Sequence, residues 1–574
     1  MIPLLRTYLR PHRWALVIVT VLLLVQAISN LYLPRLNANI INDGVVKGDT
    51  GYILRTGGFM LAVLVLLAIA SIVTVYFSAR TAMQVGREMR AHLFRQVEGF
   101  SLTQMHGFGV PSLITRTTND VQQVQMFVMM GLTMMLLAPI TAIGGVIMAL
   151  RTDAKLSLLL VVTVPLMLAV IGLMIWKAVP LFRAMQVKID RVNQVLREGL
   201  TGVRVIRAFV RTEYEEERFA EANADLTDTA LKVTRLFALA FPSLMLIMSL
   251  SSVAVIWFGG GLVDAGDMQI GNLLAFQQYI MQILFAVMMA TMMLMMVPRA
   301  SAASDRIQAV LLAAPEIGDP LRAEGRPSAG RLELDDVTFS YPGAQEPVLR
   351  NISFTLEPGQ TTAIVGGTGS GKSTLANLLP RLLDVSSGEV RLDGIDIRDM
   401  DLEVLWSAFG IVPQRAFLFS GTIQSNVRFG KPDATDDEVR RALELAQAEF
   451  VNEFEDGLDA MVEQGGANLS GGQRQRLAIA RCLVRRPLVY VFDDCFSALD
   501  YATESRLRAA LRDETRDRTV VIVAQRISTI MHADQIVVLD QGSIAGIGTH
   551  EALLETCPTY VEILSSQVSV EELA

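Results

Sequence analysis

The chain reads Gly366-Gly367-Thr368-Gly369-Ser370-Gly371-Lys372-Ser373-Thr374 at the point that decides the fold of its second half. A strand-like Ile364-Val365 precedes this stretch, and a helix-like run, Leu375 to Leu379, follows it. The order fits G-x-x-x-x-G-K-[ST] in a strand–loop–helix setting. Its glycines let backbone N–H groups converge on phosphate oxygens, and the helix start adds a favourable dipole. The stretch predicts an α/β P-loop domain that binds a nucleoside triphosphate.

Polar residues elsewhere complete this predicted site. We expect Lys372 to reach the β- and γ-phosphates and Ser373 to ligate Mg²⁺. The apolar strand 489–492 ends in two acids. Asp493 is expected to hold Mg²⁺, directly or from just outside its coordination sphere, and Asp494 to polarise water. Gln414 offers an amide oxygen to Mg²⁺ or to water, so the predicted metal ligands are Ser373, Gln414 and Asp493.

Two further features bear on the nucleotide. Tyr341, upstream of the phosphate loop, could stack on adenine, although an isolated Tyr is more often a core residue. Ser470, Gly471, Gly472 and Gln473 precede a helix-like run, which makes a second phosphate-binding device. A single ATP does not need two such devices from one domain if they lie on different faces. The economical arrangement is two domains head to tail, each closing the other's ATP.

The first half of the chain is far more apolar than the second. Of the 574 residues, 51% are hydrophobic, and the mean hydropathy is +0.40. Six apolar segments are each long enough to span a bilayer. They run roughly over residues 14–41, 53–78, 124–150, 156–180, 235–262 and 270–297. The sequence thus predicts a membrane all-α six-helix domain (1–313), a Pro- and Gly-containing linker (314–330) and an α/β nucleotide-binding domain (331–574).

Basic residues set the expected orientation and narrow the partners. The N-terminus and the charged loops 79–123 and 181–234 fall on one side, which the positive-inside rule makes cytoplasmic, together with the nucleotide domain. The formal net charge of −8 argues against nucleic acid as a partner. None of the three cysteines has metal-site spacing, and buried structural cysteines are the expected reading.

The composition of the membrane half suggests its cargo. Ionisable residues are scarce at mid-helix depth, which argues for energy from ATP rather than from an ion gradient. Helices three and six are rich in Met, which can form an adaptable surface for apolar ligands or can simply pack. Gln277, Gln278 and Gln282 are expected to form a polar stripe facing the lumen. A lipid or hydrophobic drug is the expected substrate.

Taken together, these motifs resemble a half-transporter of the ABC exporter superfamily over nearly the whole chain. Residues 366–373 resemble the Walker A motif, 489–493 Walker B, and 469–473 the ABC signature without change. Gln414 matches the Q-loop glutamine, Tyr341 the adenine-stacking aromatic and 497–500 the D-loop. The resemblance implies ATP and Mg²⁺ as ligands, ATP hydrolysis coupled to transport, and a second half-transporter as partner. It also implies a multi-pass protein of the bacterial inner membrane, with short cytoplasmic coupling segments near 107–117 and 204–214.

Two residues depart from the family pattern. Asp494 stands where the family has its catalytic Glu, and Gln525 stands where it has the switch His. Asp is shorter by roughly 1.5 Å of reach, and a misplacement of about 1 Å can cost on the order of 100-fold in rate. Gln cannot carry the proton or charge of His. With Gln414, these are the predicted catalytic residues of a weak site.

The paired departures predict a heterodimer. The chain's own Walker motifs would hold ATP at a degenerate site, while its intact signature completes the partner's catalytic site. A homodimer with two slow sites and an importer of exporter shape remain alternatives. A membrane-tethered ATPase without transport is a further alternative, which the six long spans disfavour.

Overall fold

The computed structural model describes residues 1–567, apart from the side chains of residues 294 and 295. Met295 in the predicted Met-rich stretch and the last residues of the predicted 331–574 domain therefore lie outside the description. The chain divides into two compact units. The first comprises Met1–Arg95 and Pro111–Ala313, and the second comprises Gln96–Val110 and the chain from Ala314 onward.

The first unit is entirely helical in the part that the structure describes. Its main helices are α1 (Ile2–Leu9), α2 (Arg13–Asn39), α3 (Thr50–Glu98), α5 (Val110–Thr115), α6 (Val121–Met130), α7 (Leu137–Thr152), α8 (Leu158–Thr201), α9 (Val203–Ala208), α10 (Thr212–Asp264) and α11 (Ile270–Leu311). Within residues 1–567, six helical spans are long and apolar enough to cross a membrane: Ile2–Val45, Thr50–Glu98, Val110–Thr152, Leu158–Thr201, Thr212–Asp264 and Ile270–Leu311. The predicted six-helix membrane domain is confirmed.

Amide side chains join helices inside this unit. Gln26 Nε2 donates to Thr74 Oγ1 at 2.8 Å, which links α2 to α3. Gln277 donates to Ser252 of α10 at 2.7 Å. Gln282 donates to the Asn30 carbonyl of α2 at 3.1 Å. Because lipid offers no hydrogen-bonding partner, polar groups at this depth are stabilised when neighbouring helices satisfy them. Two of the three glutamines expected to form a lumen-facing stripe are thus used between helices.

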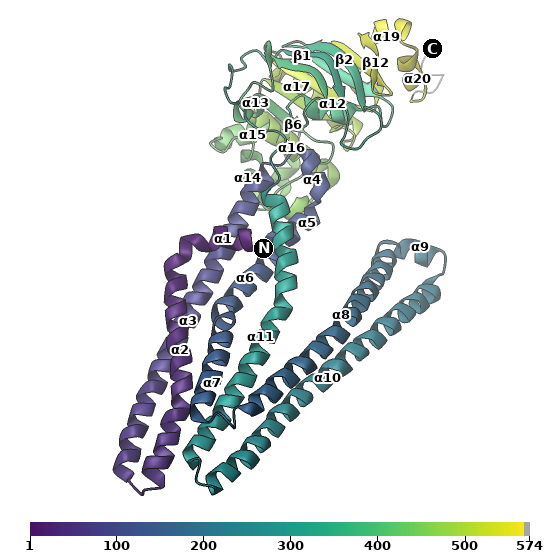
Figure 1. Cartoon of the computed structure of the whole chain (residues 1–574). Coiled ribbons are helices and arrows are strands. Elements are labelled where there is room, and N and C mark those ends of the chain that lie inside the picture. The colour runs from purple at the N-terminus through teal and green to yellow at the C-terminus, as the bar shows by residue number, and fades with distance from the viewer. Residues whose placement is uncertain (568–574) are drawn as a thin grey trace. The chain divides into compact units, whose positions relative to one another are not determined.

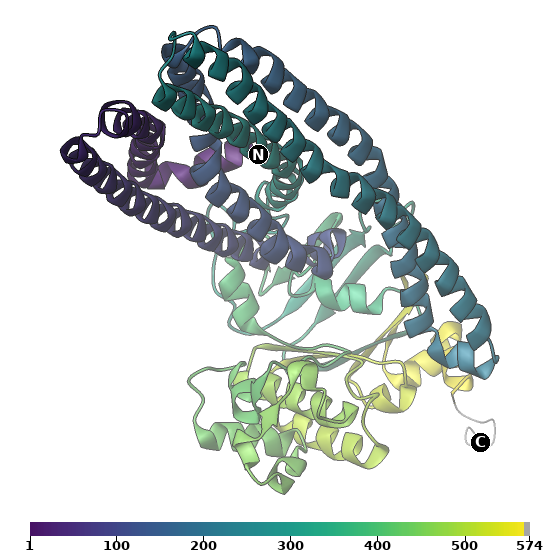
Figure 2. The same ribbon diagram turned by 90° about the horizontal axis from the view of Figure 1, so that it is seen from below.

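Helices α8 and α10 form a long antiparallel pair. Both views show them side by side, diverging from the other helices of their unit toward α9 (Figures 1 and 2). Apolar residues are exposed where the pair turns, among them Leu200, Phe209 and Val210. Val210 is 88% exposed and has φ +55°, a conformation that a β-branched residue rarely adopts. The sequence at this turn is therefore not optimised for the free hairpin.

The second unit is built on two main sheets in the described chain. One has the order β2-β1-β4-β5 and is antiparallel; the other has the order β12-β11-β3-β10-β9-β6. The strands are β1 (Leu332–Phe339), β2 (Leu349–Leu356), β3 (Thr361–Gly366), β4 (Ser387–Leu392), β5 (Ile395–Asp396), β6 (Phe409–Val412), β7 (Gly421–Thr422), β8 (Met461–Val462), β9 (Val489–Asp493), β10 (Thr519–Val523), β11 (Gln535–Asp540) and β12 (Ser543–Gly548). The short strands β7 and β8 pair with each other. The predicted α/β fold of this half is confirmed.

Parallel pairing in the larger sheet gathers the carboxyl ends of its central strands. Val523 of β10 lies in register with Ile364 of β3 on one side and with Asp493 of β9 on the other. Most side chains of β3, β9 and β10 are apolar and buried in two hydrophobic clusters. Ligands of such sheets bind beyond the carboxyl ends of the strands. That edge carries the phosphate loop and the acid pair.

Helices cover this unit and shape its loops. They are α4 (Leu102–Phe108), α12 (Lys372–Leu378), α13 (Leu402–Ala408), α14 (Ile423–Arg428), α15 (Asp436–Leu445), α16 (Gly471–Arg485), α17 (Tyr501–Glu514), α18 (Ile527–Ile530), α19 (His550–Thr556) and α20 (Pro558–Ser565). Cys482, Cys495 and Cys557, which are all the cysteines of the sequence, are buried and unpaired. Burial raises the pKa of the Cys482 thiol to about 12, so this thiol is inert at neutral pH.

Candidate nucleotide-binding site

The phosphate loop adopts a backbone that only glycine accepts comfortably. It leaves β3 at Gly366 and enters α12 at Lys372, with Gly369 at φ +83° and Gly371 at φ +97° as the helix N-cap. A Cβ on Gly366 would lie 2.2 Å from the Leu539 carbonyl oxygen. The loop is therefore closely packed against β11 at Gly366. It leads into the start of α12, and the backbone amides at a helix start favour an anion.

Two side chains of the loop, Lys372 and Ser370, are suited to binding phosphate. Lys372 Nζ donates to the Gly366 carbonyl at 2.8 Å and to the Gly367 carbonyl at 2.7 Å. Burial lowers the pKa of Lys372, and the nearby Asp494 and Asp493 oppose this shift. Ser370 Oγ is buried without a hydrogen-bond partner among the described residues. A buried hydroxyl without a partner is costly, and a phosphate oxygen would satisfy it.

Ser373 and Asp493 meet at the base of the loop. Ser373 Oγ donates to Asp493 Oδ1 at 3.2 Å, which joins α12 to the end of β9. Burial raises the pKa of Asp493, and the neighbouring Asp494 charge acts in the same direction. A hydroxyl and a half-buried carboxylate in contact offer hard oxygen ligands, which suit Mg²⁺ whose remaining ligands are phosphate oxygens and water. Among the described residues, no group of three or more His, Cys, Asp or Glu side chains is placed to hold a metal ion by itself.

Asp494 is held by two glutamines. Its Oδ2 accepts a hydrogen bond from Gln414 Nε2 at 2.9 Å and another from Gln525 Nε2 at 2.9 Å. The Asp494 backbone N–H donates to the Val523 carbonyl at 2.9 Å, and φ is +46°. Asp tolerates this left-handed conformation better than most residues. The acid is 9% exposed, so its carboxylate is oriented and largely removed from solvent.

A single cavity of ≈ 370 Å³ gathers most of the predicted residues. It is lined by Thr368, Gly369, Gly371, Lys372, Ser373, Thr374, Gln414, Asp493, Asp494 and Gln525, together with Val348 and Val523. Val348, on the turn before β2, carries no sequence signal for this role. Tyr341 lies beside the cavity, because its hydroxyl is 3.2 Å from Thr374 Oγ1. Gly366 and Gly367 take part through the carbonyls that accept from Lys372.

The signature residues lie elsewhere in the unit. Ser470 caps α16: its Oγ accepts from the Gln473 N–H at 3.2 Å, and Gln473 Oε1 accepts from the Ser470 N–H at 2.8 Å. Gly471 opens this helix, and Gly472 lies against the Ala498 carbonyl of the predicted D-loop. None of these residues lines the cavity that contains Lys372 in the described chain. The helix start is capped, exposed and available to a phosphate from another source.

Comparison with known proteins agrees with this geometry. Residues 16–287 match the family described as the ABC transporter transmembrane region, and residues 349–497 match the family described as ABC transporter. The chain is 48% identical to an uncharacterized ABC transporter ATP-binding protein of Mycobacterium tuberculosis, over 99% of this chain and 98% of that protein. The chain belongs to the ABC transporter family. It is therefore an ATP-hydrolysing, multi-pass membrane transporter.

Further relatives of this ABC transporter carry more specific names. It is 32% identical to a putative multidrug export ATP-binding/permease protein of Bacillus subtilis, over 98% of both chains. It is 30% identical to the ATP-dependent lipid A-core flippase of Vibrio vulnificus, over 97% of this chain and 96% of that one. A solved bacterial Atm1-family ABC exporter with ATP bound has the same fold, with a TM-score of 0.80, 24% identity, and coverage of 98% of this chain and 99% of that one.

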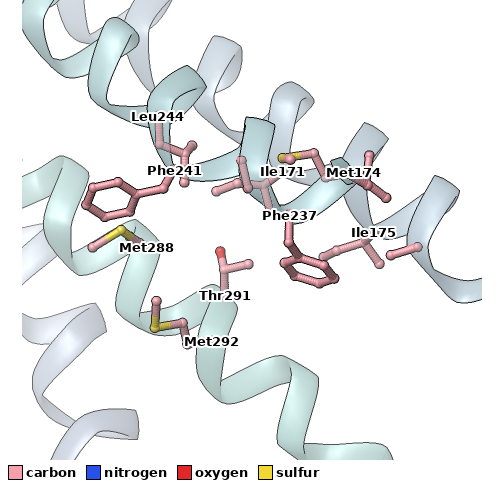
Figure 3. A pocket seen from close by; sticks show the side chains of 12 residues that line it. Ile171, Met174, Ile175, Phe237, Phe241, Leu244, Met288, Thr291 and Met292 are labelled. Atoms are coloured by element: carbon pink, nitrogen blue, oxygen red, sulfur yellow. The ribbon is translucent and has the colours of Figure 1, made fainter. Parts of the chain in front are cut away.

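The membrane unit of the transporter contains an apolar cavity of ≈ 270 Å³. Its walls come from α8, α10 and α11, and Met174, Phe237, Phe241, Met288 and Met292 point into it (Figure 3). Thr291 is the one polar residue among the described lining residues. Its hydroxyl donates to the Val287 carbonyl at 2.9 Å, so it is already satisfied by its own helix. The cavity therefore offers contact area and little hydrogen bonding.

Proposed function

We propose that this transporter is one half of a heterodimeric exporter of hydrophobic compounds. The observation that carries the proposal is the pairing of a complete phosphate site with a weak catalytic acid. One cavity is lined by Lys372, Ser373 and Asp493. The acid that follows Asp493 is Asp494, which is shorter than Glu and accepts a hydrogen bond from Gln525. Among the described residues, those of the capped signature helix at Ser470 do not line that cavity. Such a chain requires a second chain for fast hydrolysis, and its signature helix can complete the nucleotide site of that second chain.

Within the chain's own site, each residue has a distinct role. Lys372 binds the β- and γ-phosphates, and the buried Ser370 hydroxyl donates a hydrogen bond to a phosphate oxygen. Ser373 and Asp493 hold Mg²⁺, which neutralises phosphate charge when bound. Gln414 donates its amide N–H to Asp494, so its amide oxygen remains the atom available to the metal or to water. Tyr341 stacks on adenine.

Hydrolysis in this site is slow because of two substitutions acting together. Asp494 is too short to bring a carboxylate to the water that attacks the γ-phosphate. Gln525 hydrogen-bonds that same carboxylate and supplies no cationic group. The site therefore retains ATP. Ser470, Gly471, Gly472 and Gln473 close the partner's site, where turnover is fast.

The substrate is a lipid or a hydrophobic drug. The apolar cavity between α8, α10 and α11 supports this assignment, because Phe and Met side chains favour large uncharged ligands. The names of relatives, a multidrug export protein and a lipid A-core flippase, fall in the same class. The basic loops orient the nucleotide domain and both ends of the chain toward the cytoplasm of a bacterial inner membrane.

The pairing is tested by expressing the chain alone and together with a second half-transporter encoded beside it. The chain alone should bind Mg-ATP but hydrolyse it slowly, and the pair should be fast. Ser470→Ala should abolish turnover of the pair, while Asp494→Ala should only reduce it. Robust ATPase from the lone chain would contradict the heterodimer, and equal losses from both substitutions would contradict the assignment of the two sites. Uptake into inside-out vesicles decides export against import.

A further inference from the structure

The side chain of Gln567 closes onto the backbone of the loop that carries Gln525. Gln567 Nε2 donates to the Gln525 carbonyl at 2.7 Å. The Ile527 N–H donates to Gln567 Oε1 at 2.9 Å. One amide thus pairs with both backbone groups that flank Arg526, in the manner of a neighbouring strand. Gln567 follows α20, and its own N–H donates to the Leu564 carbonyl at 2.9 Å, so it is anchored to that helix.

This contact supplies a hydrogen-bond acceptor for the start of α18, which the loop itself does not provide. Helix α18 begins at Ile527, and its N-cap residue Arg526 makes no side-chain cap. The first amides of a helix have no partner within the helix. Gln567 satisfies the first of them from a distant part of the sequence. Upstream, the Ala524 N–H donates to the Ile364 carbonyl of β3 at 3.1 Å. The two residues between Ala524 and Ile527 are therefore fixed at both ends.

The direction of the Gln525 side chain depends on this fixed backbone. Gln525 Nε2 donates to Asp494 Oδ2, and Gln414 donates to the same oxygen. Hydrogen bonds thus run without interruption from the end of α20 through Gln525 to the acid of the nucleotide cavity. A shift of about 1 Å in such a group is enough to change reactivity at the site on the order of 100-fold.

We infer that Gln567 is a positioning residue of the ATP site, acting through the backbone of Gln525. The end of α20 thereby controls the position of the loop that carries Gln525 (residues 524–527, the switch loop). Loss of the Gln567 hydrogen bonds would make the side chains of Gln525 and Asp494 more mobile together. This inference goes beyond the heterodimer proposal and does not depend on it. The contact would hold whether the site turns over quickly or slowly, and it can be measured on the chain alone.

The test uses the full-length chain in lipid nanodiscs with three variants. Gln567→Met keeps the shape and removes both hydrogen bonds. Gln567→Glu keeps the acceptor for Ile527 but sets a carboxylate against the Gln525 carbonyl. Ser566→Ala is the matched control, since the Ser566 hydroxyl donates only to the Ile563 carbonyl of its own helix. The readouts are amide hydrogen exchange over 524–530 and the Kd of a fluorescent ATP analogue with Mg²⁺.

Gln567→Met should speed exchange in the switch loop by about 10-fold, the expected effect of removing one or two net hydrogen bonds. It should raise the Kd several-fold, with Gln567→Glu at least as severe and Ser566→Ala unchanged. In a Gln525→Ala background, Gln567→Met should add nothing to the Kd. The inference fails if Gln567→Met changes the Kd equally with and without Gln525, or if it changes neither readout. Exchange in β3 reports global unfolding, so a variant counts only if its exchange in β3 matches that of the parent; should Gln567→Met unfold, the milder Gln567→Asn, which keeps the amide on a shorter side chain, takes its place.

Discussion

Arg306 donates two hydrogen bonds to the Asp120 carboxylate: Nε lies 2.7 Å from Oδ2, and Nη2 lies 2.5 Å from Oδ1. The pair joins α11 to the π-helical turn η3 (Arg116–Asp120), and Arg116 Nη1 adds a hydrogen bond to the Arg306 carbonyl at 2.9 Å. The two side chains differ in environment, since Asp120 is 3% exposed and Arg306 is 50% exposed. The carboxylate therefore depends on the arginine much more than the arginine depends on the carboxylate.

This difference in burial predicts that substitutions of Arg306 and of Asp120 lower the stability by different amounts. Arg306→Met leaves a buried carboxylate without its partner and should cost about 2–3 kcal/mol of stability. Asp120→Asn keeps one acceptor and leaves a half-exposed arginine, so its cost should be about 1 kcal/mol. Thermal unfolding of the membrane unit in nanodiscs measures both. Lys232→Met, which breaks an exposed pair with Asp228, is the control and should leave the stability close to that of the parent. Equal losses from Arg306→Met and Asp120→Asn would contradict the argument.

Asp493 should give the empty nucleotide site a characteristic pH dependence. Burial raises the native pKa of Asp493 above its unfolded value, so its contribution to stability is present at low pH and is lost as pH rises through the native pKa. Asp493→Asn should therefore be more stable than the parent near neutral pH without nucleotide, and this advantage should shrink as pH falls toward the ordinary carboxyl range of about 4. With Mg-ATP the order should reverse, because the amide is not an anionic ligand.

Thermal unfolding from pH 3 to pH 8, with and without Mg-ATP, checks this prediction. Asp500→Asn is a control of opposite sign. Hydrogen bonds from the Thr503 backbone lower the pKa of Asp500, so its contribution is present above the unfolded pKa and is lost as pH falls. If the stability advantage of Asp493→Asn over the parent instead grows as the pH falls, burial does not raise the pKa of Asp493.

The proposal of a weak catalytic site predicts that a longer acid and an imidazole will raise the rate of ATP hydrolysis. Asp494→Glu adds one methylene, and Gln525→His replaces a neutral amide with a group able to carry a proton. The double variant of the lone chain should hydrolyse ATP on the order of 10- to 100-fold faster than the parent. Steady-state ATPase at saturating Mg-ATP is the measurement, with Asp494→Asn as the inactive control. No gain in a double variant that still binds Mg-ATP would place the slow step outside these two residues.

The apolar cavity should discriminate charge and tolerate the loss of its one hydroxyl. Because the Thr291 hydroxyl donates to the Val287 carbonyl of its own helix, a ligand gains no hydrogen bond from it, and Thr291→Val should change the affinity for an uncharged apolar dye by less than about twofold. Met288→Lys should weaken that affinity more than about tenfold, since an unpaired ammonium group is costly in an apolar wall. Fluorescence titration in nanodiscs measures both. A large effect of Thr291→Val would show that ligands use its hydroxyl.

Sequence patterns predicted most of the architecture because the patterns have local causes. The run Gly366–Thr374 specifies a strand, a loop and a helix in order, and apolar length specifies the six spans. The pattern could not reveal how Gln414 and Gln525 share one oxygen of Asp494. These residues are far apart in the chain, and only the parallel order of β6, β9 and β10 brings their loops together.

Other features had no sequence signal. Gln567 stands in no motif, and its two hydrogen bonds depend on where α20 ends. Gln277 and Gln282 looked suited to a polar stripe, because composition indicates that amides avoid lipid but not whether a neighbouring helix will satisfy them. Ser252 and the Asn30 carbonyl do so here, and both lie on other helices.

The turn of the α8–α10 hairpin bears on how the cell makes this protein. Leu200, Phe209 and Val210 are exposed there, and Val210 keeps a backbone conformation that its side chain disfavours. Exposed apolar side chains beyond the bilayer are what chaperones and quality-control proteases recognise. Under the proposed pairing with a second half-transporter, a chain synthesised without that counterpart should be short-lived. Its abundance in the cell should then follow the rate at which the counterpart is made, rather than its own rate of synthesis.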